Sequence, residues 1–222
     1  PNLYMMLVPS MAIGLFTKIL KQDGFEVDLF DTTRYEHSST FSTEKRVETL
    51  QYRPFNPETD VSWELLSNNE LIPDFINKIN LFSPDLLLFS VVEDTFKQAV
   101  MLLDSIADNK IPALFGGVFI TAAPEVALSY PSVKMVGVGE GEHIVKSVAR
   151  NLRDNKSLEN IPNLWIKKEN GQIIKNPPGS LMDVNIEIPD FSLFDHKRFL
   201  RPMGGRVFKT LPLETFRGCP FQ

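Results

Sequence analysis

Three short stretches place small or polar residues directly after apolar segments, which is where a sheet protein binds its ligand. Serine and glutamate end the first stretch, two glycines the second, and alternating glycine and glutamate the third. In an open parallel sheet, ligands lie in the crevice beyond the carboxyl ends of the strands. We therefore expect one binding edge built from three strand ends. The stretches are Ser90-Val91-Val92-Glu93, Gly116-Gly117-Val118 and Gly139-Glu140-Gly141-Glu142.

The residue types in the first two stretches suit the approach of a bulky ligand. Ser90 is small and offers a hydroxyl that donates one hydrogen bond. Gly116 and Gly117 remove side chains where a ligand, or another backbone, comes close. Each has a structural alternative: Ser90 fills a tight spot beside a helix start, and the glycine pair forms an ordinary turn.

The third stretch, Gly139–Glu142, joins a strand to a helix, and its backbone N–H groups can cradle polar ligand atoms. Its two carboxylates argue against a bare phosphate as the ligand, and they could instead cap the helix. The spacing is not the G-x-G-x-x-G pattern of dinucleotide-binding proteins.

The elements that carry these stretches alternate between strand and helix. Asp85–Gly117 is typical of a strand, a crossover helix and a parallel strand. A helix after Ser10 is followed by a predicted strand at Phe25–Asp31, and the segments 163–168 and 172–176 predict a β-hairpin around Asn170-Gly171. We predict an α/β fold: a doubly wound, flavodoxin-like (Rossmann-like) parallel sheet of about five strands, with a C-terminal β-hairpin and linker.

The chain divides into three parts on this interpretation. Residues 1–156 form the ligand-binding domain, with an insertion at 32–82 that contains a long polar stretch, 32–59. A loop of that length is either a functional lid or disordered. Residues 157–208 contain the hairpin and a proline-dotted linker, and residues 209–222 begin a further domain.

Composition narrows the classes of function. The formal net charge of −5 provides no field that attracts a phosphate backbone, so we expect no nucleic-acid partner. No apolar run approaches the roughly 18–20 residues of a membrane span, and we expect a cytoplasmic protein. His37, His143 and His196 lack metal-ligand spacing, and the single cysteine, Cys219, excludes a disulfide framework.

Together, the three strand ends and the C-terminal residues resemble the N-terminal cobalamin-binding domain of B12-dependent radical SAM enzymes. Their order and spacing along nearly the whole chain, rather than any one motif, carry this resemblance. The terminal RGCPFQ resembles the start of the C-x₃-C-x₂-C cluster motif of that family. The matching stretches are PDLLLFSVVEDTF (84–96), GGVFITAAPE (116–125) and VGVGEGE (136–142).

The resemblance implies that cobalamin lies on the carboxyl edge of the sheet, with its nucleotide tail or corrin edge between the strands. Cys219 would be the first ligand of a [4Fe–4S] cluster. The D-x-H-x-x-G motif, whose histidine ligates cobalt in classical corrinoid proteins, is absent from these residues, so the loop 3–9 would cover the lower face instead. The implied cofactor-binding residues are Ser90, Val91, Val92, Glu93, Gly116, Gly117, Val118, Thr121, Gly139, Glu140, Gly141 and Glu142.

The full enzyme would also bind S-adenosylmethionine on the cluster, in a C-terminal radical SAM barrel, and act on a small-molecule or peptide substrate. Methyl transfer or related radical chemistry is the expected reaction, and this portion alone is expected to be inactive. Two alternatives remain: a cofactor-free flavodoxin-like module that docks on a barrel or another partner, and a receiver-like signalling domain. The second is weaker because Asp31 lacks the accompanying acidic cluster.

Overall fold

The structure is a computed structural model of the 222-residue chain. It describes residues 8–35, 66–106, 110–182, 188–203, 206–215 and 217. Most of the 32–59 stretch, most of the 3–9 loop, His37 and Cys219 lie outside the described residues, so the expectations for them remain predictions.

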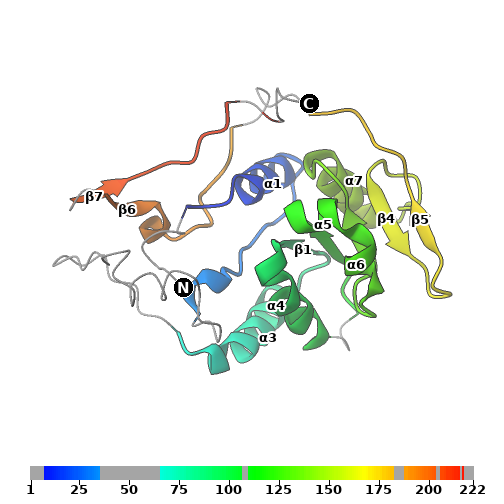
Figure 1. The fold of residues 1–222 in the computed structure, drawn as a ribbon, viewed down its shortest axis with the longest axis horizontal. Helices are drawn as coiled ribbons and strands as arrows, with labels where there is room; N and C mark the ends of the chain where they lie inside the picture. The colour runs from blue at the N-terminus through cyan, green and yellow to red at the C-terminus, as the bar shows by residue number, and fades with distance from the viewer. Residues whose placement is uncertain are drawn as a thin grey trace.

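The main sheet has five strands in the order β1-β2-β3-β4-β5, and β4 and β5 lie at one edge of the molecule (Figure 1). Strands β1 to β3 are parallel, whereas β4 and β5 pair antiparallel. This confirms the predicted flavodoxin-like α/β class with about five strands. The predicted hairpin is present, and it extends the sheet instead of standing apart from it. The strands are β1 (Leu87–Ser90), β2 (Ala113–Gly116), β3 (Met135–Gly137), β4 (Leu164–Lys167) and β5 (Ile173–Lys175).

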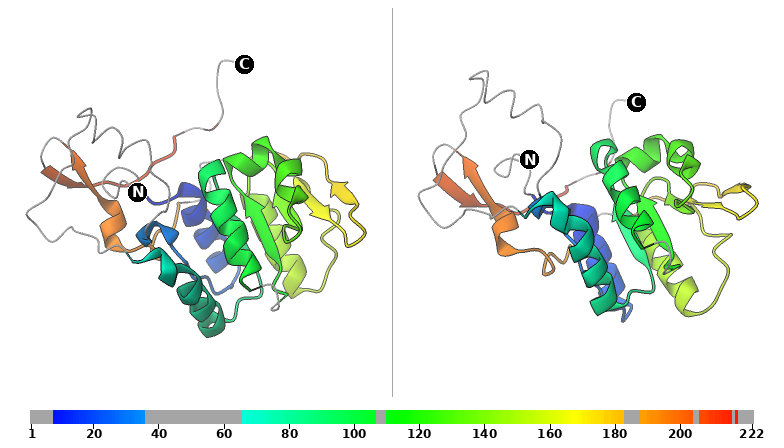
Figure 2. Two further views of the ribbon diagram at one scale, coloured as in Figure 1. Left: turned by 60° about the horizontal axis from the view of Figure 1, so that its bottom comes forward. Right: turned by 90° about the horizontal axis from the view of Figure 1, so that it is seen from below.

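Helices cover both faces of the sheet (Figure 2). Buried side chains of α1 and α7 pack on one face, and those of α3, α4, α5 and α6 pack on the other. Short 3₁₀ turns lie at Thr32–Arg34, Asn68–Glu70 and His196–Phe199. The helices are α1 (Met11–Gln22), α3 (Leu71–Phe82), α4 (Glu93–Asp104), α5 (Val118–Ala122), α6 (Pro124–Ser129) and α7 (Glu142–Arg153).

The apolar spacing of the helices explains these layers. In α7, Ile144, Val145 and Val148 are buried, and they recur at the three- and four-residue intervals that line up on one helical face. Pro73 lies in the first turn of α3, where its missing N–H would have no intrahelical partner. Pro73 is therefore compatible with the helix.

The predicted strand at Phe25–Asp31 is wrong as a hydrogen-bonded strand. The segment belongs to no strand ladder among the described residues, and β1 is the first strand of the sheet. Phe25, Val27 and Phe30 nevertheless pack against the two hydrophobic clusters. The alternation of apolar residues in this segment reflects burial of one side of the chain and not hydrogen bonding to a neighbouring strand. A sequence pattern does not distinguish these two causes.

The segment after residue 188 folds back on the sheet domain. The Asp190 amide donates to the Gly14 carbonyl at 2.9 Å, and the Lys21 ammonium pairs with the Asp190 carboxylate at 2.9 Å. A second, two-stranded sheet follows, β6 (Leu200–Met203) with β7 (Arg206–Lys209). The sequence pattern of Lys209–Thr215 predicts a strand there, but β7 ends at Lys209. Residues 210–215 form no strand and run back from β7 towards the sheet domain (Figure 1). No helix in the described ranges is both long and apolar enough to cross a bilayer.

Lys167 stabilises the end of α6. Its ammonium donates to the carbonyls of Leu128 and Tyr130, both at 2.5 Å, and burial lowers its pKa. These carbonyls belong to the last turn of α6 and its cap, which have no partner within the helix.

Replacing Lys167 by methionine should therefore destabilise the fold, because the Leu128 and Tyr130 carbonyls each lose a hydrogen bond, and only Tyr130 keeps another described donor, the Val133 amide at 3.2 Å. We expect a loss of about 1–2 kcal/mol in the free energy of unfolding, measured by urea titration. Lys168→Met is the matched control, because that side chain ion-pairs with the Glu159 carboxylate at the surface and caps no helix. Equal losses in the two variants would contradict the capping role.

Candidate functional site

The structure brings the three predicted strand ends together at one edge of the sheet. Ser90 pairs with Gly116 in register, and the Val91 amide donates to the Gly116 carbonyl at 2.9 Å. The Gly139 amide donates to the Thr121 hydroxyl at 3.0 Å, which ties the third loop to the helix after the second. We call this carboxyl edge of β1, β2 and β3 the ledge.

A cavity of about 190 Å³ opens beside the ledge. It lies between α1, the extended segment around Val27, the strand ends and the start of α7. Ser90, Gly116, Gly117, Gly139 and Gly141 of the predicted site line it. The side chains that enclose it are mostly apolar: Ile13, Phe16, Thr17, Val27, Leu29 and Ile144.

The two adjacent glycines differ in what they do. A Cβ atom placed on Gly116 meets no atom within 4 Å, so the absent side chain leaves open space. A Cβ on Gly117 would lie 2.3 Å from the Val91 carbonyl oxygen, and the φ angle of +110° is one that residues with side chains rarely adopt. Gly116 opens the cavity, and Gly117 allows the turn that follows.

Two apolar side chains stand exposed on the ledge, one after β1 and one after β2. Val92 is 47% exposed and Val118 is 71% exposed. Glu93 and Ser90 are also exposed, whereas Val91 is buried in the hydrophobic core and faces away from solvent. The exposed pair gives the ledge an apolar rim beside the cavity.

The carboxylates of the third loop contact the chain's own C-terminal part. Glu142, only 4% exposed, pairs with the Arg217 guanidinium at 2.5 Å. Glu140 lies 3.6 Å from the same guanidinium and accepts a hydrogen bond from the Met182 amide at 2.5 Å. Both carboxylates therefore already have partners within the protein.

Sequence reasoning missed the contribution of α1 and of the segment after it. Phe16 and Thr17 line the cavity, Thr17 is 1% exposed, and the Phe16 ring lies against Gly141. The apolar stripe of α1 predicts a buried face but not which part of the sheet it covers. A polar threonine on the buried face of α1 is unusual, but its burial is seen only in the structure and could not be predicted from the sequence.

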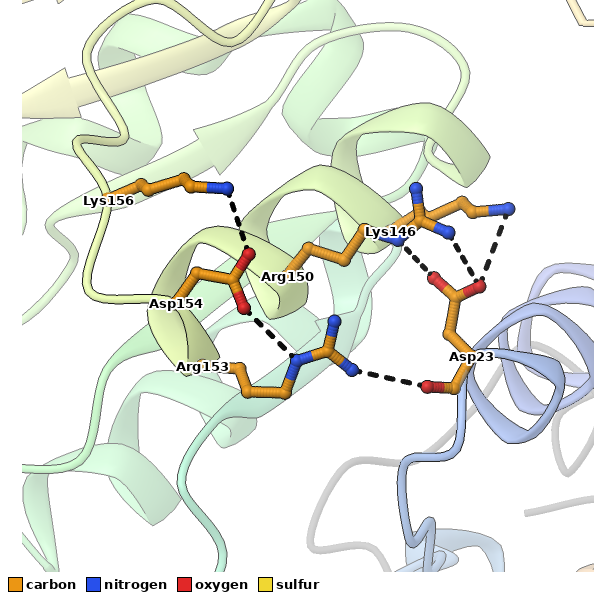
Figure 3. Close-up of polar contacts among 6 residues, drawn as sticks. All are labelled: Asp23, Lys146, Arg150, Arg153, Asp154 and Lys156. Carbon is orange, nitrogen blue, oxygen red and sulfur yellow. Dashed lines mark hydrogen bonds and ion pairs between the residues drawn. The ribbon is translucent and has the colours of Figure 1, made fainter.

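An ion-pair network fixes α1 against α7 and so holds the wall of the cavity in place (Figure 3). The Arg150 guanidinium donates twice to the Asp23 carboxylate, at 2.5 and 2.8 Å, and the Lys146 ammonium lies 3.7 Å from it. Arg153 donates to the Asp23 carbonyl at 3.2 Å. The hydrogen bonds from Arg150 hold the pKa of Asp23 below its usual value.

Asp23→Asn should lower the thermal midpoint, and the effect should depend on pH. A carboxylate whose pKa is depressed by folding stabilises the protein above its unfolded pKa, near 4, and this contribution is lost as the pH falls through the folded pKa. At pH 7 we expect a midpoint up to about 3 °C lower than that of the wild type. The difference should shrink in melts below about pH 4.

Glu169→Gln is the control for this prediction, because the Glu169 side chain is 94% exposed and its nearest ammonium is 3.8 Å away. It should leave the midpoint unchanged at both pH values. A pH-independent effect of Asp23→Asn would show that the charge of Asp23 is not what matters.

Metal-ligating side chains do not gather in this part of the structure. The described residues contain no group of three or more His, Cys, Asp or Glu that could hold a metal ion. His143 and His196 are exposed.

Comparison with known proteins adds a structural relationship but no sequence relationship. No protein-family model matches the chain, and no curated protein matches it. Among solved structures, the radical S-adenosylmethionine methyltransferase TsrM from Kitasatospora setae, with cobalamin and a [4Fe–4S] cluster bound, has a TM-score of 0.56 and 18% identity over 82% of this chain. The cobalamin-dependent S-adenosylmethionine radical enzyme OxsB, with aqua-cobalamin and S-adenosylmethionine bound, has a TM-score of 0.54 and 17% identity over 79% of this chain.

This chain shares their fold. The resemblance to B12-dependent radical SAM enzymes that the motifs indicate is thus confirmed at the level of structure. A second TsrM structure, with tryptophan substrate and a SAM analogue bound, matches equally well, with a TM-score of 0.57 and 18% identity over 80% of this chain. The chain spans 28% of the matched TsrM structure, 29% of the second and 21% of OxsB, so it corresponds to less than a third of each.

Proposed function

We propose that this chain is the cobalamin-binding portion of a B12-dependent radical SAM enzyme. The observation that carries the proposal is the open space over Gly116, in a largely apolar cavity at the carboxyl edge of a parallel sheet. Sheets of this class bind ligands at that edge. Proteins that share the fold are solved with cobalamin bound.

The shape of the site fits such a cofactor in two parts. A dry cavity of about 150 Å³ is known to bind benzene, so about 190 Å³ accepts one aromatic ring system but not a whole corrin. The exposed Val92 and Val118 then offer an apolar surface on which a larger ring can lie outside. This division agrees with cobalamin, which has a nucleotide base on a flexible tail and a broad macrocycle.

The residues of the ledge would bind and orient the group. Ser90 would donate a hydrogen bond at the cavity mouth, and Gly116 would admit the tail beneath α1. Phe16, Val27 and Leu29 would exclude water from it. Bound cobalamin would supply methyl-transfer chemistry, and the protein would orient the cofactor and exclude water from it.

The remaining predicted parts concern the whole enzyme. By its motif, Cys219 would be one of three cysteine ligands of a [4Fe–4S] cluster that binds S-adenosylmethionine, in a barrel C-terminal to this chain. Methyl transfer or related radical chemistry on a small-molecule or peptide substrate would follow. With one cluster ligand, this portion should be inactive by itself.

Spectroscopy tests the proposal directly. The chain is purified, incubated with hydroxocobalamin and desalted, and its visible absorption spectrum is recorded. We expect a corrinoid spectrum in a ratio approaching one cofactor per chain. A colourless protein that gives a cooperative thermal melt would contradict the proposal and favour the cofactor-free module.

A further inference from the structure

Arg217 connects the C-terminal part of the chain to the third loop of the ledge. Its guanidinium contacts three carboxylates: Glu142 at 2.5 Å, Glu214 at 3.0 Å and Glu140 at 3.6 Å. Cys219 follows two residues later in the sequence. Glu140 and Glu142 belong to the loop that closes one side of the candidate site.

The arrangement requires an arginine. Three carboxylates around one cation use the fork of donors that a guanidinium presents, with Nη1 towards Glu140, Nη2 towards Glu142, and both Nη2 and Nε towards Glu214. An ammonium is a compact point charge and does not reproduce this geometry. The ion pairs to Glu142 and Glu214 outweigh the effect of burial and raise the pKa of Arg217, so the cation stays charged.

Glu142 in turn depends on Arg217. It is the first residue of α7, where the helix dipole favours a negative charge, yet the side chain is 4% exposed. A buried carboxylate is costly unless it is paired and hydrogen-bonded. Glu142 therefore places a buried negative charge at the edge of the candidate site. Among the contacts described, the cation that pairs with this charge is Arg217, which comes from another segment of the chain.

We propose that Arg217 is a positioning residue: through Glu140 and Glu142 it holds the segment leading to Cys219 beside the ledge. Resting on the proposed function, this means that one side-chain network joins a loop of the corrinoid site to Arg217, two residues before the first cluster ligand in the sequence. The third loop of the ledge and the segment around Arg217 should then move together.

The chain provides its own probe for this idea, because Cys219 is its only cysteine. A nitroxide attached to Cys219 reports the mobility of the segment by electron paramagnetic resonance, in the chain without cobalamin. We expect a motionally restricted spectrum in the wild type. Glu142→Gln and Arg217→Gln should give a mobile spectrum, and Arg217→Lys should not restore the restricted one.

The control is Glu159→Gln, which removes a surface carboxylate that ion-pairs with Lys168. It should leave the nitroxide spectrum as in the wild type. Thermal melts of all variants separate loss of the contact from loss of the fold, and Glu140→Gln provides a milder variant if Glu142→Gln melts early. Identical spectra in the wild type and in folded Arg217→Gln would overturn the proposal.

Proteolysis gives a second measurement without a label. Trypsin cleaves after Arg217 only when the segment is released, and cleavage tracks the open population, so we expect Glu142→Gln to accelerate it by about tenfold or more. Cleavage after the exposed Arg206 serves as the internal reference. Equal acceleration at both sites would mean general loosening and would contradict a specific tether. Because neither measurement uses cobalamin, a chain that fails to bind it would refute the proposed function and leave the tether to be decided separately.

Discussion

Gly117→Ala should be among the most destabilising single substitutions in this chain, with a loss of about 3 kcal/mol or more in the free energy of unfolding. Two costs add: a strained backbone conformation, worth roughly 1–3 kcal/mol, and the insertion of a methyl group into occupied space, worth about the same. The φ angle at Gly117 is +110°, and the new Cβ would lie 2.3 Å from the carbonyl oxygen and 2.9 Å from the amide nitrogen of Val91. These are backbone atoms, so no side-chain rotation relieves the clash.

Urea unfolding followed by circular dichroism measures this loss, and Gly116→Ala provides the control one residue away. A Cβ at Gly116 meets nothing within 4 Å, so its unfolding free energy should change by no more than about 0.5 kcal/mol. If both alanines are tolerated equally, the turn after β2 does not depend on a close approach to Val91. If both are equally harmful, the space over Gly116 is occupied by other atoms of the protein.

The difference between these glycines marks a limit of sequence reasoning at this site. Both follow a buried apolar strand, and the pattern indicates only that something comes close to each. The Val91 backbone comes close to Gly117, whereas a Cβ atom on Gly116 would meet no atom within 4 Å. Pairwise distances between segments decide this, and no local pattern encodes them.

Other features followed directly from the sequence because local chemistry determines them. The parallel strands β1, β2 and β3 were predictable from short apolar runs separated by helical spacing, and their common edge follows from parallel pairing. The hairpin followed from Asn170-Gly171, where the positive φ of +83° at Gly171 matches the turn preference.

Features that depend on distant segments were not predictable. The segment 25–31 alternates like a strand but gains its stability by packing on two clusters. The wall that α1 contributes to the cavity depends on where Asp23 meets Arg150 of α7. The burial of Glu142 is explained only by Arg217, far along the chain.

The open space over Gly116 leads to a graded prediction. Substituting Gly116 by alanine, valine and leucine should fill the cavity progressively, because each side chain projects where nothing lies within 4 Å. Hydroxocobalamin affinity, measured by absorbance titration, should fall along the series, by at least about tenfold for leucine. A ring that enters the cavity must overlap the leucine side chain, whereas alanine leaves most of the volume free.

Stability separates occlusion of the site from damage to the fold. An added apolar side chain that fills an empty apolar cavity makes new contacts, so Gly116→Leu should keep the wild-type unfolding free energy within about 1 kcal/mol or exceed it. Val126→Leu, at an exposed position of α6, is the matched control and should change neither affinity nor stability. Undiminished binding in a folded Gly116→Leu chain would mean that the cofactor lies on the ledge alone. Lost stability would mean that this space is too small to hold even one side chain, and therefore too small to hold the nucleotide base of a corrinoid.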